Sequence, residues 1–175
     1  MLALLLVTRV VIGDAFPARV LPALDGHAVE LPAAGRVVVI ELFATWCAPC
    51  RQSLPQLERL RSRFGDRVTF VTVSEDEGAD AVERVSGFAA DLKLSGTVLL
   101  DRDHALYEQL VVRKLPTTYV VDSRGIVRHI NNGFGPGYER RLAGWIEQTS
   151  RAEAVPAPDA SPSTRGRDPR ARQMP

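Results

Sequence analysis

The sequence has few side chains of the kinds that bind metals most tightly. Its 175 residues include only two cysteines and three histidines, His27, His104 and His129, which stand singly along the chain. A structural zinc site normally takes four protein ligands, often with closely spaced histidines, so this shortage argues against a zinc protein. Two cysteines also cannot form the disulfide framework of a small secreted domain, and their number leaves the cellular compartment open.

The sequence also lacks a long hydrophobic run. Leu2–Leu6 and Val10–Ile12 form an apolar stretch that Thr8 and Arg9 interrupt, well short of the roughly 20 residues of a transmembrane helix. The stretch has neither the positive start nor the small-residue cleavage site of a signal peptide. We interpret residues 1–12 as the remnant of an export signal or membrane anchor, and the alternative is a strand or helix that packs on the domain.

Charge of one sign is not in excess, because the formal net charge is +1. A chain so nearly neutral gives no reason to expect nucleic acid or a strongly acidic partner. Hydrophobic residues make up 45% of the chain, which is enough for a core, and the length suits one domain with extensions. We place this domain at residues 13–150.

The end of the chain has no aromatic residue and is rich in arginine and proline. Residues 151–175 contain Pro156, Pro158, Pro162, Pro169 and Pro175. Such a composition cannot bury enough apolar surface to order itself. We expect residues 151–175 to be a disordered tail, free in solution rather than bound to an anionic membrane.

The two cysteines that are present, Cys47 and Cys50, stand at a junction. The apolar, β-branched run Val37–Phe43 predicts a buried strand before them, and apolar residues at helical spacing predict a helix over residues 47–64. The partial positive charge of a helix N-terminus favours thiolate over thiol. We expect Cys47 to be the more acidic and exposed cysteine, and Cys50 to face inward and attack Cys47 once that residue is bound to a substrate. The inferred chemistry is thiol–disulfide exchange through a mixed disulfide.

The Cys47/Cys50 pair has two alternative interpretations. The pair could be half of a zinc site, but no second cysteine pair exists in the sequence. It could be a purely structural disulfide, but a loop so short restrains the unfolded chain least. The redox interpretation is preferred, because a cysteine pair of this spacing near a βαβ pattern is typical of redox proteins.

The segment Phe43-Ala44-Thr45-Trp46-Cys47-Ala48-Pro49-Cys50 resembles the active-site segment of thioredoxin-fold reductases. The wider sequence, from Gly13 to Gln148, resembles the TlpA/ResA-like branch, whose members reduce disulfides in bacterial cell envelopes. The resemblance implies an α/β, three-layer thioredoxin fold with a mixed central sheet. It also implies substrate contacts at Trp46, Ala48 and Pro49.

Several further elements follow from local patterns. Asp25-Gly26 between two short alternating runs predicts an N-terminal hairpin, which in the family covers one edge of the sheet. Beyond the redox helix, the patterns predict strands at 67–74, 97–101, 115–122 and 126–130 and helices at 79–94, 104–112 and 138–148. The helix at 79–94 should turn Val82, Val85, Phe88, Ala89 and Leu92 inward, and with the strand at 97–101 it forms an inserted helix-strand unit. We expect Asp101 or Asp103 to cap the helix at 104–112 and His104 to be a surface residue at its start. We expect the acidic run 75–77 to be solvated surface.

Glu41 is the one carboxylate in the apolar strand, six residues before Cys47. Burial should raise its pKa, the direction that suits a proton acceptor near neutral pH. In thioredoxins a buried acid occupies the matching place and helps deprotonate the inner cysteine, and the resemblance implies this role for Glu41. The alternative is that Glu41 points to the strand end and pairs with an arginine.

Leu115-Pro116-Thr117-Thr118 is the second informative segment, because a proline just before a strand cannot donate to the sheet. In the thioredoxin fold the matching proline is cis and lies against the cysteine pair, and the Pro-Thr-Thr run is typical of the TlpA-like branch. The resemblance implies that the backbone of Leu115 binds the extended chain of a substrate and that Pro116 shapes the groove. An ordinary trans proline is the alternative.

The predicted activity is reduction of disulfides in partner proteins, with Cys47, Cys50, Glu41 and Pro116 in the roles given above. It needs an upstream thiol electron donor but no metal or organic cofactor. The family implies the periplasm or cell envelope, without excluding the cytoplasm, and we expect a monomer. The alternatives are a disulfide oxidase or isomerase on the same site, and a non-catalytic thiol chaperone or copper(I)-binding module, since soft thiolates suit copper(I).

Overall fold

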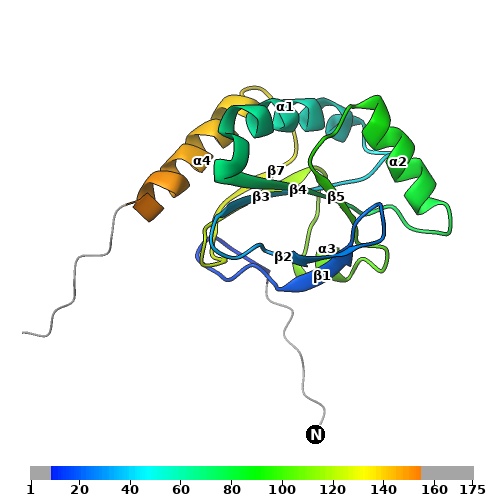
Figure 1. The fold of residues 1–175 in the computed structure, drawn as a ribbon, viewed down its shortest axis with the longest axis horizontal. Helices are drawn as coiled ribbons and strands as arrows, with labels where there is room; N and C mark the ends of the chain where they lie inside the picture. Colours follow the sequence, from blue (N-terminus) through cyan, green and yellow to red (C-terminus); the bar gives the residue numbers. More distant parts are fainter. Residues whose placement is uncertain (1–8, 155–175) are drawn as a thin grey trace, which may run out of the picture.

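The protein is built around a five-stranded mixed sheet with secondary structure on both faces (Figure 1). The computed structural model describes residues 9–154. In chain order the elements are β1 (Arg19–Pro22), β2 (Ala28–Leu31), β3 (Val37–Phe43), α1 (Ala48–Phe64), the 3-10 turn η1 (Gly65–Arg67), β4 (Val68–Ser74), α2 (Ala81–Asp91), β5 (Thr97–Leu100), α3 (Ala105–Gln109), β6 (Thr117–Val121), β7 (Val127–Asn132) and α4 (Tyr138–Ala154).

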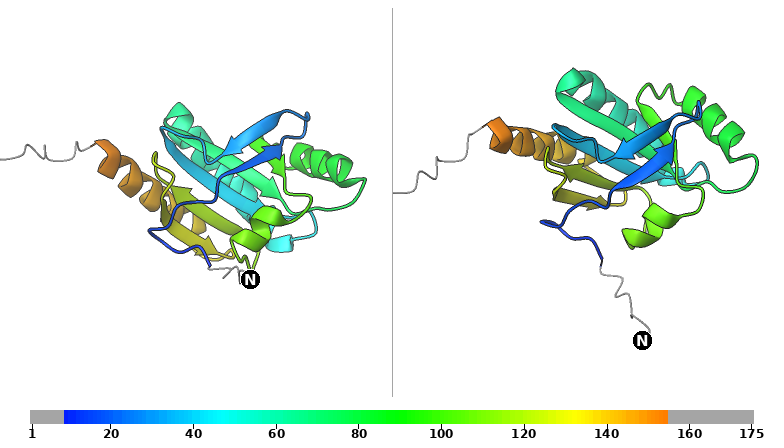
Figure 2. Two further views of the ribbon diagram at one scale, coloured as in Figure 1. Left: turned by 90° about the horizontal axis from the view of Figure 1, so that it is seen from below. Right: turned by 60° about the horizontal axis from the view of Figure 1, so that its bottom comes forward.

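The strand order in the main sheet is β5-β4-β3-β6-β7. β3 pairs in parallel with β4, and β4 with β5, whereas β6 runs antiparallel to both β3 and β7. Helices α1, α2 and α4 cover one face, and α3 with the β1–β2 hairpin covers the other (Figures 1 and 2). The predicted three-layer α/β architecture, with a mixed sheet and an inserted α2–β5 unit, is therefore confirmed.

β3 is the centre of this arrangement, and all of its residues are buried. Because side chains alternate along a strand, Val37, Val39 and Phe43 pack under α1 and α4, and Ile40 and Leu42 pack toward the hairpin and α3. An almost unbroken apolar run is what a strand covered on both faces requires. Glu41 falls on the α1 side of the sheet by the same alternation.

The N-terminal hairpin forms as predicted, with Gly26 at positive φ in its turn. β1 and β2 make a separate two-stranded sheet, and Ala23 at its end forms an antiparallel bridge to Leu99 of the edge strand β5. The hairpin thus reaches one edge of the main sheet while lying over its face (Figure 2).

The prediction that Val82 faces the core is wrong. α2 begins at Ala81, and the residues it buries are Ala81, Val85, Phe88 and Ala89, which recur at helical spacing. Val82 directly follows Ala81, so its side chain points to a different side of the helix, and it is 37% exposed. The apolar stripe therefore contains Ala81 in place of Val82, and Leu92 packs partly buried at its end.

The predicted start of the tail at residue 151 is also corrected, because α4 continues to Ala154 rather than ending at Gln148. The residues that extend it are good helix formers, and proline first interrupts them at position 156. Glu153 is held against the domain by the backbone N–H of Ser123. The rest of the predicted tail and residues 1–8 of the predicted signal remnant lie outside the described residues. Among residues 9–154, no helix has the length and apolar character that crossing a membrane requires.

The turn between β6 and β7 is organised by the buried carboxylate of Asp122. It accepts hydrogen bonds from the backbone N–H groups of Arg124 and Ile126, both at 2.9 Å, and from Arg128 Nε at 2.8 Å. Burial alone would raise the pKa of Asp122, but the bonds from Ile126, Arg128 and Arg124 outweigh it and hold the pKa below its usual value.

We predict that Asp122→Asn lowers the free energy of unfolding by about 2 kcal/mol at neutral pH, the scale of hydrogen bonds to a charged group. A carboxyl group whose pKa is lower in the folded state stabilises the fold at pH values above its unfolded pKa of about 3.9. This contribution to stability is lost as pH falls through the folded-state pKa. The difference from wild type should therefore shrink below about pH 4 in urea titrations. Asp66→Asn, on the exposed turn η1, is the control, and an Asp122→Asn deficit that stays constant into acid would contradict the account.

Candidate redox site

The cysteine pair lies at the junction between β3 and α1. Cys47 is the N-cap of α1, in extended backbone conformation, and its Sγ accepts a hydrogen bond of 3.3 Å from the backbone N–H of Cys50. The two cysteines are joined by a disulfide bond, with their Cα atoms 5.3 Å apart. Pro49 fits the first turn because the N–H it lacks would have no partner within the helix.

Exposure separates the two sulfur-bearing residues as predicted. Both cysteines are buried, but Cys47 keeps 5% of its surface exposed and Cys50 none, whereas Trp46 beside them is 73% exposed. Ala48 and Pro49 are exposed as well, so three predicted substrate contacts surround Cys47 at the surface. The unpaired N–H groups of the first turn stabilise negative charge on the Cys47 sulfur when the disulfide is reduced.

Glu41 lies beneath the pair, completely buried, in contact with three hydroxyl groups. Ser53 Oγ donates to Glu41 Oε1 at 2.6 Å, Thr118 Oγ donates to Oε2 at 3.1 Å, and the Tyr138 hydroxyl also donates to Oε2. Ser53 Oγ lies 3.2 Å from the backbone carbonyl of Cys50 as well. The hydroxyl of Ser53 therefore stands between the acid and the inner cysteine.

The pKa of Glu41 is raised by its burial, against which the hydrogen bonds from Ser53, Tyr138 and Thr118 act only in part. The pKa of Tyr138 is raised too, by burial and then by the nearby Glu41 charge. The alternative in which Glu41 pairs with an arginine is wrong, because its partners are hydroxyls. Ser53, Thr118 and Tyr138 do not stand out in the sequence as site residues, because hydroxyl side chains at these positions carry no local signal.

Pro116 is cis, as predicted. Pro116 directly precedes β6, whose first residue, Thr117, pairs with Leu42 near the C-terminal end of β3. Pro116 therefore lies at the end of the sheet where the chain leaves β3 toward Cys47. Its carbonyl accepts a 2.7 Å hydrogen bond from Gly133 N–H, whereas the N–H and carbonyl of Leu115 have no partner among residues 9–154. The Leu115 backbone can therefore bond to an extended chain.

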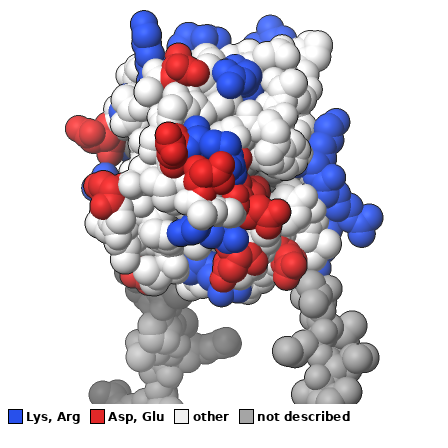
Figure 3. All heavy atoms as spheres, turned by 90° about the vertical axis from the view of Figure 1, so that its right-hand side faces the viewer, with Lys and Arg blue, Asp and Glu red and all other residues white. Residues whose placement is uncertain are grey.

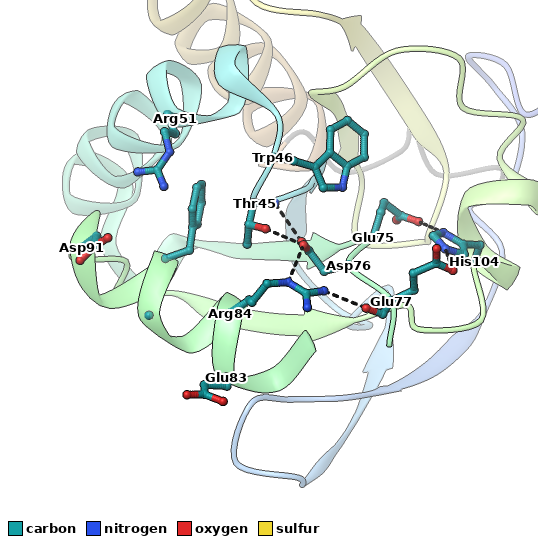
Figure 4. A pocket seen from close by; sticks show the side chains of 12 residues that line it. Thr45, Trp46, Arg51, Glu75, Asp76, Glu77, Glu83, Arg84, Asp91 and His104 are labelled. Carbon is teal, nitrogen blue, oxygen red and sulfur yellow. Dashed lines mark hydrogen bonds and ion pairs between the residues drawn. The ribbon is translucent and has the colours of Figure 1, made fainter. Parts of the chain in front are cut away.

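The acidic loop after β4 is only in part the solvated surface that its composition suggested, because Glu77 is exposed but its two neighbours are not. Glu75 and Asp76 are buried, at 3% and 2% exposure. Asp76 accepts hydrogen bonds from Thr45 N–H and Ser74 Oγ, both at 2.8 Å, which ties the loop to the segment just before Trp46 (Figure 4). A side-chain network formed across the fold thus overrides the local preference of a charged loop for water.

His104 is not a free surface residue at the start of α3. It takes the left-handed backbone conformation, and its ring nitrogens lie 3.2 Å from Glu75 Oε2 and 3.4 Å from Glu77 Oε2 (Figure 4). Asp101, one of the two expected caps, is buried and accepts the N–H groups of Leu106 and Tyr107, at 3.2 and 2.9 Å. Asp103, the other, accepts the N–H of Ala105 at 3.3 Å.

Comparisons with known proteins agree with this geometry. The Redoxin family matches residues 12–144, and the chain belongs to that family. Thioredoxin-like protein YneN of Bacillus subtilis is 31% identical over 122 residues, 69% of this chain and 71% of that protein. Thiol-disulfide oxidoreductase ResA of Geobacillus kaustophilus is 30% identical over 128 residues, 72% of each.

Solved structures show the same fold. A candidate thiol:disulfide interchange protein DsbE from Chlorobium tepidum superposes with a TM-score of 0.73 at 27% identity, covering 80% of this chain and 98% of that one. StoA from Bacillus subtilis superposes with a TM-score of 0.63 at 21% identity, covering 74% and 96%. The protein has the thioredoxin fold, and with its Cys47–Cys50 pair it is a thiol-disulfide oxidoreductase.

We predict that Glu41→Gln alters the pH dependence of stability in the oxidised protein. A carboxyl whose folded-state pKa is raised keeps its proton after the unfolded chain has lost it, so stability falls as pH rises above the unfolded value of about 4.3. Each such proton changes the free energy of unfolding by about 1.4 kcal/mol per pH unit until the folded pKa is reached.

The measurement is urea unfolding across the range from acid to mildly alkaline pH. The free energy of Glu41→Gln should fall less steeply than that of wild type as pH rises. Glu30→Gln, an exposed change of the same kind on β2, should keep the wild-type slope. Parallel profiles for Glu41→Gln and wild type would show that Glu41 ionises normally.

Proposed function

We propose that the protein reduces disulfide bonds in partner proteins. The observation that carries this is the Cys47–Cys50 pair at the N-terminus of α1, with the outer sulfur capping the helix and the inner one buried. This arrangement favours a Cys47 thiolate that can attack and a Cys50 that can only react internally.

The reaction balances over two steps. In the reduced protein the Cys47 thiolate attacks one sulfur of a substrate disulfide, forming a mixed disulfide and releasing the other substrate sulfur as a thiolate that takes up a proton. Cys50, once deprotonated, attacks Cys47 Sγ, breaks the mixed disulfide and releases the second substrate thiol. The substrate gains two electrons and two protons, and the protein ends with the Cys47–Cys50 disulfide, which an upstream thiol donor reduces again.

Glu41 accepts the proton of Cys50 in this proposal. The support is its burial, its raised pKa and the Ser53 hydroxyl, which contacts both the acid and the Cys50 backbone. Thr118 and Tyr138 hold the carboxylate in place from β6 and α4. No counter-charge is needed nearby, because the acid changes between a protonated and an ionised form during turnover.

The substrate chain lies between Trp46 and the Leu115-Pro116 segment. This placement is supported by the exposed indole, by the exposed Ala48 and Pro49, and by the backbone groups of Leu115, which have no partner within residues 9–154. An extended chain that bonds to the Leu115 backbone would present its disulfide to Cys47 in the manner of an added strand. The protein acts as a monomer and requires no metal or organic cofactor.

The periplasm or cell envelope is the proposed location. The resemblance to the ResA-type proteins supports it, and one structural relative of the same fold is described as secreted. A cytoplasmic location is the alternative. An upstream donor in the same compartment is then required, because every turnover consumes two electrons.

The reduction potential of the Cys47/Cys50 couple tests the direction of electron flow. We expect a value near roughly −270 mV, as in thioredoxin, measured by equilibration in glutathione and dithiothreitol buffers and alkylation of the free thiols. A value near roughly −120 mV would make the protein a disulfide donor, the oxidase alternative.

Copper(I) titration of the reduced protein addresses the metallochaperone alternative, for which we expect no tight stoichiometric complex.

The role of Glu41 is tested by the rate at which Cys50 resolves a mixed disulfide formed on Cys47. In wild type this rate should rise with pH through the raised pKa of Glu41, because only the ionised carboxylate accepts a proton. Glu41→Gln should remove that rise and slow resolution near neutral pH by about a hundredfold. Glu30→Gln is the matched control, and identical pH profiles for Glu41→Gln and wild type between about pH 6 and 9 would refute the role.

A further inference from the structure

A cavity of about 800 Å³ opens beside Trp46, the residue directly before Cys47. Its walls are the first turn of α1, the loop 75–77, one side of α2 and His104, and we call it the acidic pocket (Figure 4). Trp46 stands at its mouth with 73% of its surface exposed. Any protein whose disulfide approaches Cys47 therefore brings its neighbouring residues to this pocket.

Acidic side chains outnumber basic ones in the lining of the pocket. Five carboxylates face it, those of Glu75, Asp76, Glu77, Glu83 and Asp91, against two arginines and one histidine. On the face of the molecule that Figure 3 presents, acidic side chains gather near the centre, with basic side chains among them. The formal net charge of the whole chain is only +1, so this is a local feature.

The two arginines of the pocket are already engaged. Arg84 lies 3.8 Å from Asp76, is paired with Asp80, and donates to the carbonyl of Glu77 at 2.8 Å. The guanidinium of Arg51 lies 4.6 Å from the centre of the Phe88 ring. Neither Glu83 nor Asp91 has an ion-pair partner among the described residues. The field in the open part of the pocket is therefore negative.

Glu75 is the unusual member of this set. Its side chain is 2% exposed, Oε2 lies 3.2 Å from His104 Nδ1, and Oε1 has no hydrogen-bond partner among residues 9–154. Burial, and then the charges of Asp101 and Asp76, raise the pKa of Glu75 to about 9. Buried polar groups are nearly always hydrogen-bonded, so this oxygen in the pocket wall is a candidate contact for a bound group.

The carboxyl groups of Asp76, Asp101 and Glu77 lie near Glu75, so this region favours a cationic donor over an anion. An anion would be repelled. A metal ion would need a set of three or more ligands, and the described part of the chain contains no such group. A lysine ammonium or an arginine guanidinium supplies both the hydrogen bond and the charge, and the exposed indole of Trp46 can cover its aliphatic stem or face its cation.

We propose that the acidic pocket binds a lysine or arginine side chain of the substrate protein, with Glu75 as its buried partner. The inference rests on the proposed function, since it places the cation close to the disulfide that Cys47 attacks. It adds a substrate preference: disulfides flanked by basic residues are bound more tightly than those flanked by neutral or acidic ones.

The pocket should release a proton when it binds such a side chain. At mildly alkaline pH Glu75 is protonated, and an adjacent cation lowers its proton affinity. The other groups that face Glu75 are His104, Asp76, Asp101 and, across the His104 ring, Glu77. Exposed carboxylates such as Glu83 and Asp91 can attract a cation as well, so a difference in affinity alone does not show that Glu75 takes part.

The test is binding to the oxidised full-length protein, in which no thiol exchange can take place. The probes are three blocked eight-residue peptides of alanine and glycine with one serine in place of the substrate cysteine. They carry lysine, norleucine or glutamate two residues from the serine. Isothermal titration at about pH 8 in phosphate and in Tris, whose ionisation enthalpies differ, gives the affinity and the number of protons released.

We expect the lysine peptide to bind about tenfold more tightly than the norleucine peptide, the glutamate peptide to bind most weakly, and protons to be released only with lysine. Glu75→Gln should abolish the proton release and most of the preference for lysine. Glu30→Gln, on the exposed face of β2, should change neither. If Glu75→Gln fails to fold, the comparison of peptides and buffers on wild type still decides the question.

Equal affinities for lysine and norleucine, no detectable binding of the lysine peptide, or a preference for lysine without proton release would each overturn the proposal. None of these outcomes depends on reduction of a disulfide. The reduction potential tests the proposed function separately, so a failure of one is distinguishable from a failure of the other.

Discussion

The first turn of α1 has backbone N–H groups without partners in their own helix, and the redox pair depends on this. Cys47 caps that turn through its sulfur, and Cys50 follows one turn later, facing the core. The position of this helical turn is fixed by β3, because β3 is buried on both faces and its pairing register cannot shift without moving its side chains to the wrong face. Packing of one strand thus places a sulfur where a helix end stabilises its negative charge.

Buried carboxyl groups recur in the structure, and most accept hydrogen bonds from hydroxyls or backbone amides. Glu41 accepts from three hydroxyls, Asp76 from a backbone amide and two hydroxyls, and Asp101 from two backbone amides. Asp122 combines amides with an arginine. Glu75 is the exception, since one of its oxygens has no donor within the described residues. Its position beside the redox helix gives that exception a functional interpretation.

The two sides of the redox site differ in what they offer a substrate. On the side of Pro116, the backbone of Leu115 can bond to an extended chain, whatever its sequence. On the side of Trp46, a negatively charged pocket can select among side chains. A general backbone contact and a selective charged contact on either side of Cys47 are compatible with a protein that acts on disulfides in a limited set of partners.

The sequence by itself determined the elements whose cause is local. The apolar run at 37–43 predicted a strand buried on both faces, Asp25-Gly26 predicted the hairpin, and the position of Cys47 at a helix start predicted the more exposed cysteine. The tertiary structure alone decided the partners of Glu41, since Thr118 and Tyr138 stand 77 and 97 residues away along the chain. It also decided the burial of Glu75 and Asp76 and the outward turn of Val82. Periodicity and residue type report a segment's own preferences, whereas hydrogen-bond partners and burial of polar loops depend on segments that meet only when the sheet is assembled.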